Sequence, residues 1–264
     1  MHYIKEINFN LERSVPFPFD VPAIKFAKHI QCDSPITFFI GDNGTGKSTL
    51  LETIAYKLQL PHMDSSSYEK PSFNAAKKLI PYIEFKWNMQ RPIGFFFRAE
   101  DFGDYMNSIH RRDFELHRQL KSLEGEVPDH IIKEMKENAN FQIHHMRNEF
   151  GQELTSFSHG EAYLRIMQEK FDRRGIYILD EPEAALSPTK QLSLIYFIQS
   201  HLKLHQSQFI IATHSPMLMA IPGAQIYEIT DHEMQLKSLE ETEHYTITKT
   251  FLNNPDMYLD ALGR

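Results

Sequence analysis

GDNGTGKST, residues 41–49, matches the pattern G-x-x-x-x-G-K-[ST]. It follows ITFFI (36–40), a continuous apolar run typical of a buried strand, and a helix is predicted from STLLETIAYKL (48–58) directly after it. In this strand–loop–helix order, glycines let the loop curl so that its backbone surrounds phosphate oxygens. At average composition the motif arises by chance in on the order of one chain in a hundred of this length. The stretch therefore predicts a nucleotide-phosphate site.

The residue types in this loop have separate physical roles. Backbone N–H groups would bind phosphate oxygens, and the positive end of the following helix would point toward them. Lys47 would contact the β- and γ-phosphates, and Ser48 would hold Mg²⁺. The residues predicted to bind nucleotide here are Gly41, Asp42, Asn43, Gly44, Thr45, Gly46, Lys47, Ser48 and Thr49.

A second apolar run, IYIL (176–179), carries two carboxylates to its end. Asp180 and Glu181 follow it directly, and buried carboxylates without a partner would be costly at that place. A bound metal and a water that loses a proton account for both residues. Asp180 would hold Mg²⁺ through water, and Glu181 would be the general base, with Glu183 the next candidate. The alternative is a pair of acids at an exposed strand tip that cap the next loop.

A third strand, in IIATHSP (210–216), ends at His214. A lone histidine is commonly a surface residue or a satisfied core residue. Here, however, the strand end lies at the same edge of the predicted sheet as Lys47 and Asp180. We therefore predict that His214 contacts the γ-phosphate.

The segment LTSFSHGEAYLRI (154–166) contains a helix start with two interpretations. Ser158 followed by Glu161 is the capping-box pattern, in which the serine hydroxyl accepts a bond from a first-turn N–H. The free N–H groups and the dipole of a helix start also favour a bound anion. Both interpretations stay open on the residues alone.

Strands that alternate with helices predict an α/β fold with a mostly parallel sheet, whose ligands bind at the carboxyl ends of the strands. Ser187 is expected to cap a helix that begins with Pro188. The polar residues 104–149 are expected to form a helical region. We predict one domain over 1–264 with a helical insert at about 101–157. The other expected strands are 82–88 and 93–99, with a turn between them, 175–179, 208–213, and a closing hairpin of 224–230 with 233–239.

Composition narrows the classes of function. The chain has 264 residues and a net charge of −7, so its surface as a whole is not that of a nucleic-acid-binding protein, although a local basic groove would suffice for DNA. Cys32 is the single cysteine, which fits a reducing cytoplasm. No apolar run approaches the roughly 18 residues of a membrane span. We therefore expect a cytoplasmic protein without a membrane segment of its own.

Taken in order from Gly41 to His214, these motifs resemble those of the ATP-binding-cassette (ABC) ATPases. More narrowly, DEPEAALSP (180–188), ATHSPML (212–218) and TEHYTITKTFLNNPDMYL (242–259) are similar to small stand-alone bacterial "AAA family" predicted ATPases of the SMC–RecF-like branch. The resemblance implies a P-loop NTPase fold with an ABC-ATPase-like sheet, N-terminal antiparallel strands and a helical insert. It also implies that ATP and Mg²⁺ are the cofactors.

The resemblance further implies an ATP-dependent homodimer. In that family the signature serine and glycine, here Ser158 and Gly160, bind the γ-phosphate held by the other subunit. Two departures are visible. Ser187 stands where the family usually has an aspartate, and the family's strand-end glutamine has no clear match, with Arg98 and Glu100 as the alternatives. Phe17 and Phe19 are candidates for stacking on adenine, and core packing is the alternative for both.

Three functions are compatible with these residues. The first is an ATPase whose ATP-driven dimer acts as a switch, either in DNA repair of the double-strand-break type or in defence, with DNA as a candidate partner. The second is the ATP-binding subunit of an ABC transporter. The third is a nucleotide-binding regulator of a partner enzyme, in which hydrolysis is slow or incidental.

Overall fold

The computed structural model describes residues 3–11, 16–63, 73–89, 93–122, 127–128 and 159–261. The chain divides into two compact units. The first, which we call the sheet unit, comprises Met1–Ala99 and Arg173–Arg264, and the second, the helical unit, comprises Glu100–Asp172. One domain over the whole chain with an insert at about 101–157 stays a prediction.

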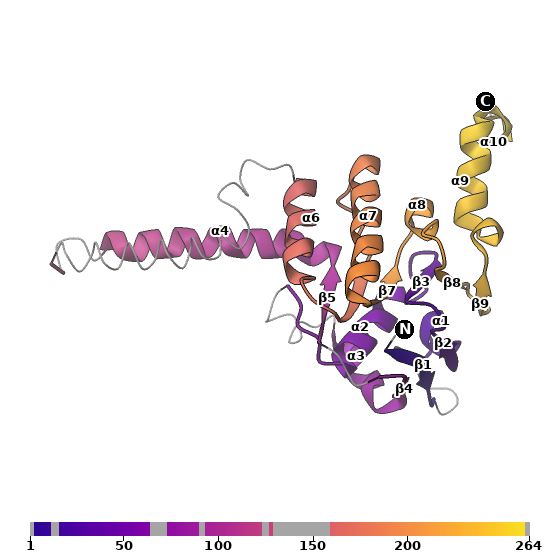
Figure 1. Cartoon of the computed structure of the whole chain (residues 1–264), viewed down its shortest axis with the longest axis horizontal. Helices are drawn as coiled ribbons and strands as arrows, with labels where there is room; N and C mark the ends of the chain where they lie inside the picture. The colour runs from indigo at the N-terminus through magenta and orange to yellow at the C-terminus, as the bar shows by residue number, and fades with distance from the viewer. Residues whose placement is uncertain are drawn as a thin grey trace. The chain divides into compact units, whose positions relative to one another are not determined.

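A six-stranded sheet forms the centre of the sheet unit (Figure 1). Its five strands from β5 to β8 pair in parallel, and β9 pairs antiparallel with β8 as the expected hairpin. The prediction of an α/β fold with a mostly parallel sheet is therefore confirmed. In sheet order the strands are β5 (Gly94–Arg98), β6 (Ile176–Asp180), β7 (Gln208–Ala212), β3 (Ile36–Gly41), β8 (Gln225–Ile229) and β9 (Met234–Lys237).

Helices cover both faces of this sheet, which explains why its strands are continuous apolar runs. Ile178 and Ile210 belong to the same buried cluster as the apolar residues of α2 (Lys47–Lys57). Tyr177 and Phe209, one residue earlier in each strand, point to the opposite face. Their rings contact the ring of His201, on α7 (Pro188–His205), at centroid distances of 5.0 and 5.7 Å.

Most residues of the α2 helix are buried, and its apolar side chains belong to the core of the sheet unit. Leu50, Leu51 and Ile54 are fully buried, and Leu58 just beyond the helix is 2% exposed. Glu52, Thr53 and Ala55, on other faces of α2, are buried as well. The remaining elements of the sheet unit are α1 (Pro22–Lys25), α3 (Asn74–Leu79), η3 (Ile80–Tyr82), α8 (Pro216–Met219), η4 (Leu239–Glu241), α9 (Glu243–Asn253) and α10 (Pro255–Ala261).

A second, antiparallel sheet has the order β2-β1-β4, formed by His29–Gln31, Ile4–Phe9 and Ile83–Trp87. The expected strands at 82–88 and 93–99 both exist. The turn expected between them, at residues 90–92, lies outside the described residues. The two strands are not neighbours in a sheet, because β4 pairs with β1 whereas β5 pairs with β6. The burial patterns account for this: β5 is buried at every position, whereas β4 is exposed at several positions and suits a sheet with one open face.

The side chain of Gln208 joins the two sheets. Its Oε1 accepts hydrogen bonds from the backbone N–H groups of Tyr3 and Ile4 at 3.0 and 2.8 Å. Its Nε2 donates to the carbonyl oxygen of Ile4 at 3.0 Å. Gln208 is fully buried, so these bonds satisfy polar groups that water does not reach.

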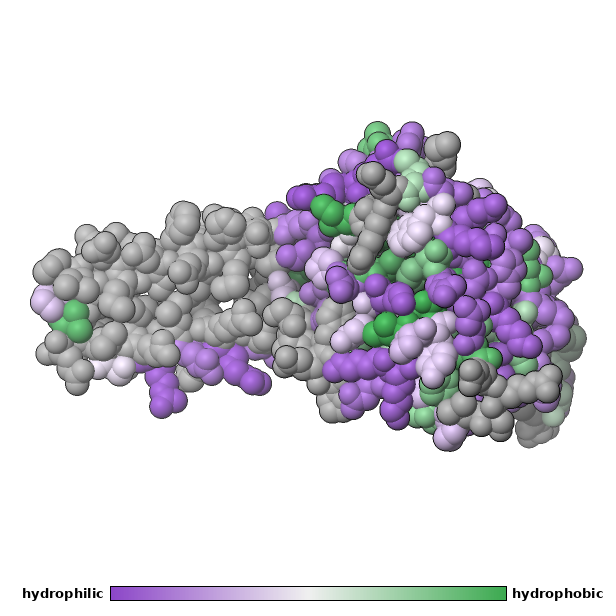
Figure 2. Space-filling model, turned by 90° about the horizontal axis from the view of Figure 1, so that it is seen from below, coloured by the Kyte–Doolittle hydropathy of each residue, from purple (hydrophilic) through white to green (hydrophobic). Residues whose placement is uncertain are grey.

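The helical unit contains α4 (Ala99–Ser122) and α6 (His159–Lys170). Phe102 and Tyr163 pack edge to face in its interior, with ring centroids 5.1 Å apart. The charged region expected to be helical, 104–149, is helical up to Ser122, and its residues 123–126 and 129–149 lie outside the described residues. No helix in the part of the chain that the structure describes is long and apolar enough to cross a membrane. Hydrophilic residues predominate among the coloured residues in Figure 2, with apolar ones in small groups between them.

The expected cap at Ser187 is only partly correct. Ser187 occupies the N-cap position of α7 and Pro188 follows it, but the serine hydroxyl makes no capping hydrogen bond. Proline at the first helical position has no N–H to satisfy and has a φ suited to a helix, so it favours this helix start without help from the hydroxyl.

We predict that Gln208→Leu lowers the free energy of unfolding by about 2–4 kcal/mol, because it leaves buried backbone groups without partners. Urea unfolding followed by circular dichroism would measure the change. Gln235→Leu is the matched control, since Gln235 is exposed on β9 and should change stability little. Equal effects of the two substitutions would contradict the assigned role of Gln208.

Candidate nucleotide-binding site

The loop between β3 and α2 has a backbone that requires glycine. Gly41, Gly44 and Gly46 have φ values of 143°, 87° and 90°, which side chains rarely allow. Space is restricted as well. A Cβ at Gly41 would meet the Ile229 carbonyl oxygen at 2.2 Å, and one at Gly46 would meet Val21 Cγ2 at 2.9 Å. The glycines of the motif are therefore needed for the fold of the loop, whatever it binds.

One bond from a neighbouring helix and one bond within the loop fix its shape. The N–H of Ala23, in α1, donates to the carbonyl oxygen of Thr45 at 2.8 Å. The hydroxyl of Thr45 donates in turn to the carbonyl oxygen of Asp42 at 2.8 Å. Gly46 is the N-cap of α2 and has no side chain with which to cap it. The first-turn N–H groups of α2 are thus open to an anion.

Lys47 is buried, at 4% exposed, and lies against its own loop. Its ammonium donates to the carbonyl oxygens of Gly41 and Asp42 at 2.8 and 3.0 Å. Burial lowers the pKa of Lys47, and the negative charges of Glu181 and Asp180 oppose that shift. The structure therefore brings the lysine of the loop within electrostatic range of the two predicted carboxylates.

Asp180 and Glu181 lie where β6 ends. Asp180 is 3% exposed, and the N–H of Glu181 donates to the carbonyl oxygen of Ala212 at 2.9 Å. Glu181 has a φ of 48°, an uncommon conformation for a residue with a side chain. Its carboxylate is 41% exposed, so a general base at this position would be open to water.

His214 lies next to Glu181, with its Nε2 3.5 Å from Glu181 Oε1. Burial lowers the pKa of His214, and the charge of Lys47 lowers it further, so the neutral ring is favoured at neutral pH. Lys47 begins the helix after β3, Glu181 directly follows β6, and His214 lies just beyond β7. In the structure the three side chains lie at one edge of the sheet, which is the predicted arrangement.

Glu183, the second candidate for the base, supports the His214 loop. Its Oε1 accepts the backbone N–H of His214 at 2.7 Å. Burial raises the pKa of Glu183, and hydrogen bonds from Thr213 and His214 oppose that rise. This carboxylate is occupied in holding the loop, whereas Glu181 is open to solvent.

The residues predicted to hold Mg²⁺ have the chemistry that this ion prefers. Ser48, in the first turn of α2, offers a hydroxyl, and Asp180 offers a carboxylate. Mg²⁺ is usually held by one or two such oxygens together with substrate phosphates and water. Among the described residues, no group of three histidine, cysteine, aspartate or glutamate side chains could hold a metal by itself. Ser48 and Asp180 therefore fit an Mg²⁺ ion whose other ligands are the phosphates of a nucleotide and water.

The predicted signature lies only partly in the described chain. Gly160 is in the first turn of α6, within the helical unit, and Ser158 lies outside the described residues. Their binding of a partner's nucleotide stays a prediction, as does the capping interpretation of Ser158. Both candidates for stacking on adenine lie within the described residues. Phe17 is 59% exposed, whereas Phe19 packs edge to face on Tyr82 and against the core.

Arg98, one alternative for the strand-end glutamine, forms a buried ion pair that sequence reasoning missed. Its Nη1 lies 2.5 Å from Glu52 Oε1, on α2, and its guanidinium lies over the ring of Phe73 at 5.5 Å. Both charged side chains are at most 7% exposed. A signal was available in the sequence, because Glu52 stands between the buried Leu51 and Ile54. Glu100, the other alternative, lies in the first turn of α4.

One family matches the greater part of the chain. It is described as "AAA domain, putative AbiEii toxin, Type IV TA system", and it matches residues 57–220. The chain belongs to this family. As a member of this AAA-domain family the chain is a P-loop ATPase domain of the ABC/AAA type. The matched range includes Glu181 and His214, and the phosphate loop precedes it.

Similarity to other proteins is more distant. The Nisin transport ATP-binding protein NisT of Lactococcus lactis subsp. lactis is 25% identical over 232 residues. That match covers 84% of this chain but only 37% of the longer NisT. A metal-chelate type ABC transporter structure, in an inward-facing conformation, is 14% identical with a TM-score of 0.47, covering 94% of this chain and 88% of that one. CbiO1 from Clostridium perfringens, part of the ABC transporter complex cbiONQ, is 16% identical with a TM-score of 0.45, covering 97% of both chains.

We predict that Arg98→Met alone lowers the free energy of unfolding by about 3–5 kcal/mol, because it leaves Glu52 as an unpaired buried charge. The double variant Arg98→Met/Glu52→Leu should recover most of that loss. Guanidinium unfolding would measure both. Arg165→Met is a control, since Arg165 and Glu169 are 44% and 30% exposed in their pair, and its loss should cost under about 1 kcal/mol. A neutral Arg98→Met variant would contradict the structural role.

Proposed function

We propose that the chain is an Mg²⁺-dependent ATPase that acts in the cytoplasm. The observation that carries the proposal is the meeting of Lys47, Glu181 and His214 at the carboxyl ends of parallel strands, with Glu181 and His214 3.5 Å apart. A cation held against a glycine loop and an exposed carboxylate suit phosphoryl transfer to water, and a neutral imidazole can donate a hydrogen bond to a phosphate oxygen.

In this mechanism the loop backbone and Lys47 bind the β- and γ-phosphates of ATP. Glu181 accepts a proton from water, whose oxygen forms a bond to the γ-phosphorus while the bond to the bridging oxygen breaks. His214 donates a hydrogen bond to a γ-phosphate oxygen. Ser48 and Asp180 would hold Mg²⁺, Asp180 through water, and the ion would offset negative charge on the phosphate oxygens.

We further propose that ATP closes a homodimer in which Ser158 and Gly160 of one subunit bind the γ-phosphate held by the other. The resemblance to ABC-type ATPases supports this. The position of Gly160 in the first turn of a helix also supports it, since such a turn offers N–H groups to an anion. In a twofold dimer each composite site would draw Lys47 from one chain and Gly160 from its partner.

For the biological process we propose a nucleotide-driven switch of the SMC–RecF-like branch, in DNA repair or in defence. The toxin named in the family description favours defence. DNA is the candidate partner, bound weakly and only through a local groove, because a chain with a net charge of −7 must place its positive charge unevenly to bind DNA. ATPase rates measured with duplex, nicked and single-stranded DNA would test this part, and rates indifferent to all three would count against it.

A second candidate function is the ATP-binding subunit of an ABC transporter, which the 25% identity to NisT favours. In that case the chain would bind a membrane-embedded partner and its ATPase activity would respond to that partner, not to DNA. A nucleotide-binding regulator of another enzyme is the third, and it would bind ATP with negligible turnover.

We predict that Lys47→Ala weakens ATP binding at least tenfold, or about 1.4 kcal/mol, because it removes the cation aimed at the phosphates. Isothermal titration calorimetry would measure the affinity. Lys25→Ala is the matched control: Lys25 is an exposed cation on α1, beside the same loop, and its loss should change affinity little. Unchanged affinity in Lys47→Ala would rule out the phosphate-loop assignment.

We predict that Glu181→Gln keeps ATP binding but lowers turnover about a hundredfold or more, since an amide cannot take a proton from water. Phosphate release would measure turnover, with Glu183→Gln as the comparison. In the Glu181→Gln variant, ATP should shift the protein from monomer to dimer in light scattering. Full turnover in Glu181→Gln with loss in Glu183→Gln would move the base to Glu183, and a strict monomer would remove the dimer from the proposal.

A further inference from the structure

His214 has a second neighbour besides Glu181. Its Nδ1 lies 3.1 Å from Nε2 of His244, and the two ring centroids are 5.3 Å apart. The other ring nitrogen of His214, Nε2, faces Glu181 Oε1 at 3.5 Å. His214 therefore lies between a carboxylate on one side and a second imidazole on the other.

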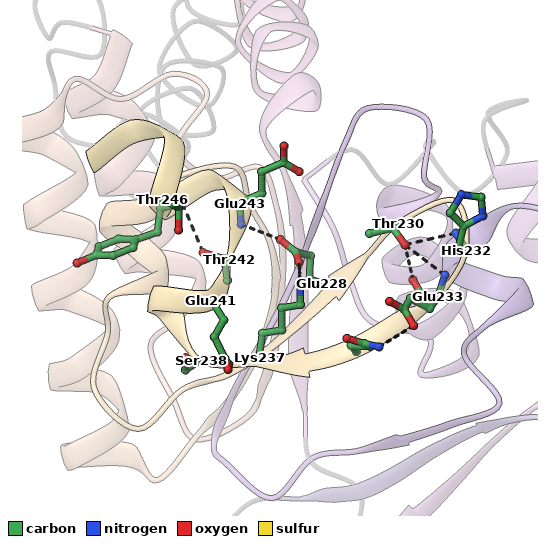
Figure 3. A network of polar contacts seen from close by, with 12 residues as sticks. Glu228, Thr230, His232, Glu233, Lys237, Ser238, Glu241, Thr242, Glu243 and Thr246 are labelled. Carbon is green, nitrogen blue, oxygen red and sulfur yellow. Dashed lines mark hydrogen bonds and ion pairs between the residues drawn. The ribbon is translucent and has the colours of Figure 1, made fainter. Parts of the chain in front are cut away.

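His244 is held in place by contacts that do not involve His214. It is the second residue of α9, and the N–H of the first, Glu243, donates to Glu228 Oε1 at 3.1 Å (Figure 3). The other carboxylate oxygen of Glu228 pairs with Lys237, so this side chain joins both strands of the β8–β9 hairpin to the helix. Thr242 caps α9 by accepting from the N–H of Tyr245 at 3.4 Å. The first turn of α9, with His244, is thus anchored to the sheet.

A hydrogen bond between two imidazole rings has a direction, because one of the facing nitrogens must carry the proton and the other must be bare. If His214 carried its proton on Nδ1, its bare Nε2 lone pair would face Glu181. That lone pair would repel the carboxylate, and it would repel a phosphate oxygen equally. If His244 supplies the proton, His214 carries its own on Nε2 and can donate toward the carboxylate or a phosphate. The negative charge on this side favours the second arrangement.

We propose that His244 is a positioning residue: its Nε2–H donates to Nδ1 of His214 and holds His214 as the tautomer whose Nε2–H points toward the nucleotide. This inference rests on the proposed ATPase function, in which His214 donates to the γ-phosphate. The partner on the far nitrogen of a histidine generally sets which nitrogen is protonated and how the ring is oriented. His244 thereby makes the C-terminal helix α9 part of the ATPase site.

Variants of His244 separate this role from a packing role. His244→Leu should lower kcat for ATP about tenfold or more while leaving the ATP affinity within about twofold. His244→Gln places an amide N–H near the Nε2 position and should recover most of kcat. His244→Asn, whose amide reaches only the Nδ1 position, should not. His232→Leu is the control, because His232 is an exposed histidine in the turn between β8 and β9.

Each outcome of these measurements either supports or overturns the role of His244. The unfolding midpoint of each variant would show whether a lower kcat results from lost stability. Recovery of kcat by His244→Gln but not by His244→Asn would support a hydrogen bond donated by His244 to His214. A His244→Leu variant with the kcat of an active wild type overturns the inference and leaves the ATPase proposal intact. Equal kcat in His244→Gln and His244→Asn also overturns it. If the wild type itself fails to hydrolyse ATP, the proposed function is at fault, and a second readout tests the inference.

That readout is the tautomer itself, observed without nucleotide. Two-dimensional NMR of ¹⁵N-labelled histidine distinguishes a protonated from a bare ring nitrogen, and His214→Ala identifies the signals of His214. We expect Nε2–H on His214 in the wild type and in His244→Gln, and a mixture of tautomers in His244→Leu. Nδ1–H on His214 in the wild type, or an unchanged tautomer in His244→Leu, would overturn the inference whatever the ATPase activity.

Discussion

The parallel register of β6, β7 and β3 governs where the candidate catalytic groups lie. Asp180 pairs with Ala212, and Ala212 pairs with Phe39, so three strands reach the same level together. Backbone hydrogen bonds extend this alignment by one residue. The N–H of Glu181 donates to the carbonyl oxygen of Ala212, and the N–H of Thr213 donates to that of Phe39. A one-residue slip would turn the side chain at the end of a strand to the other face. The site is therefore built by strand pairing before any side chain contributes.

One strand, β8, supports the site from two directions. The carbonyl oxygen of Ile229 lies against Gly41 and permits only glycine at the first position of the phosphate loop. The adjacent Glu228 is directed to the other side of the strand, where it binds Lys237 and the N–H of Glu243. The same short strand thus limits the shape of the phosphate loop and anchors the helix that carries His244. A perturbation of β8 would reach both ends of the candidate site.

Local patterns in the sequence were sufficient for the six strands of the larger sheet and for most of the candidate site. The apolar runs before Gly41, Asp180 and His214 each predict a strand with a polar residue at its end, and the alternation with helices predicts the parallel order. What escaped prediction depends on contacts between distant segments. The pair of Arg98 with Glu52 joins residues 46 positions apart, and that of His214 with His244 joins residues 30 apart. Periodicity within one segment contains no information about such partners, and the same is true of β4 and β5, whose neighbours lie in other parts of the chain.

The position of β3 between β7 and β8 has a consequence for the order of folding. The phosphate loop follows β3 early in the chain, but both strands that flank β3 come from the last quarter of the sequence. The bonds of Gln208 to Tyr3 and Ile4 likewise close loops of 205 and 204 positions. Such closures are entropically costly and slow folding. During synthesis the loop sequence would therefore leave the ribosome long before its supporting strands, and it would acquire its native geometry only when the C-terminal half of the sheet unit has joined β3.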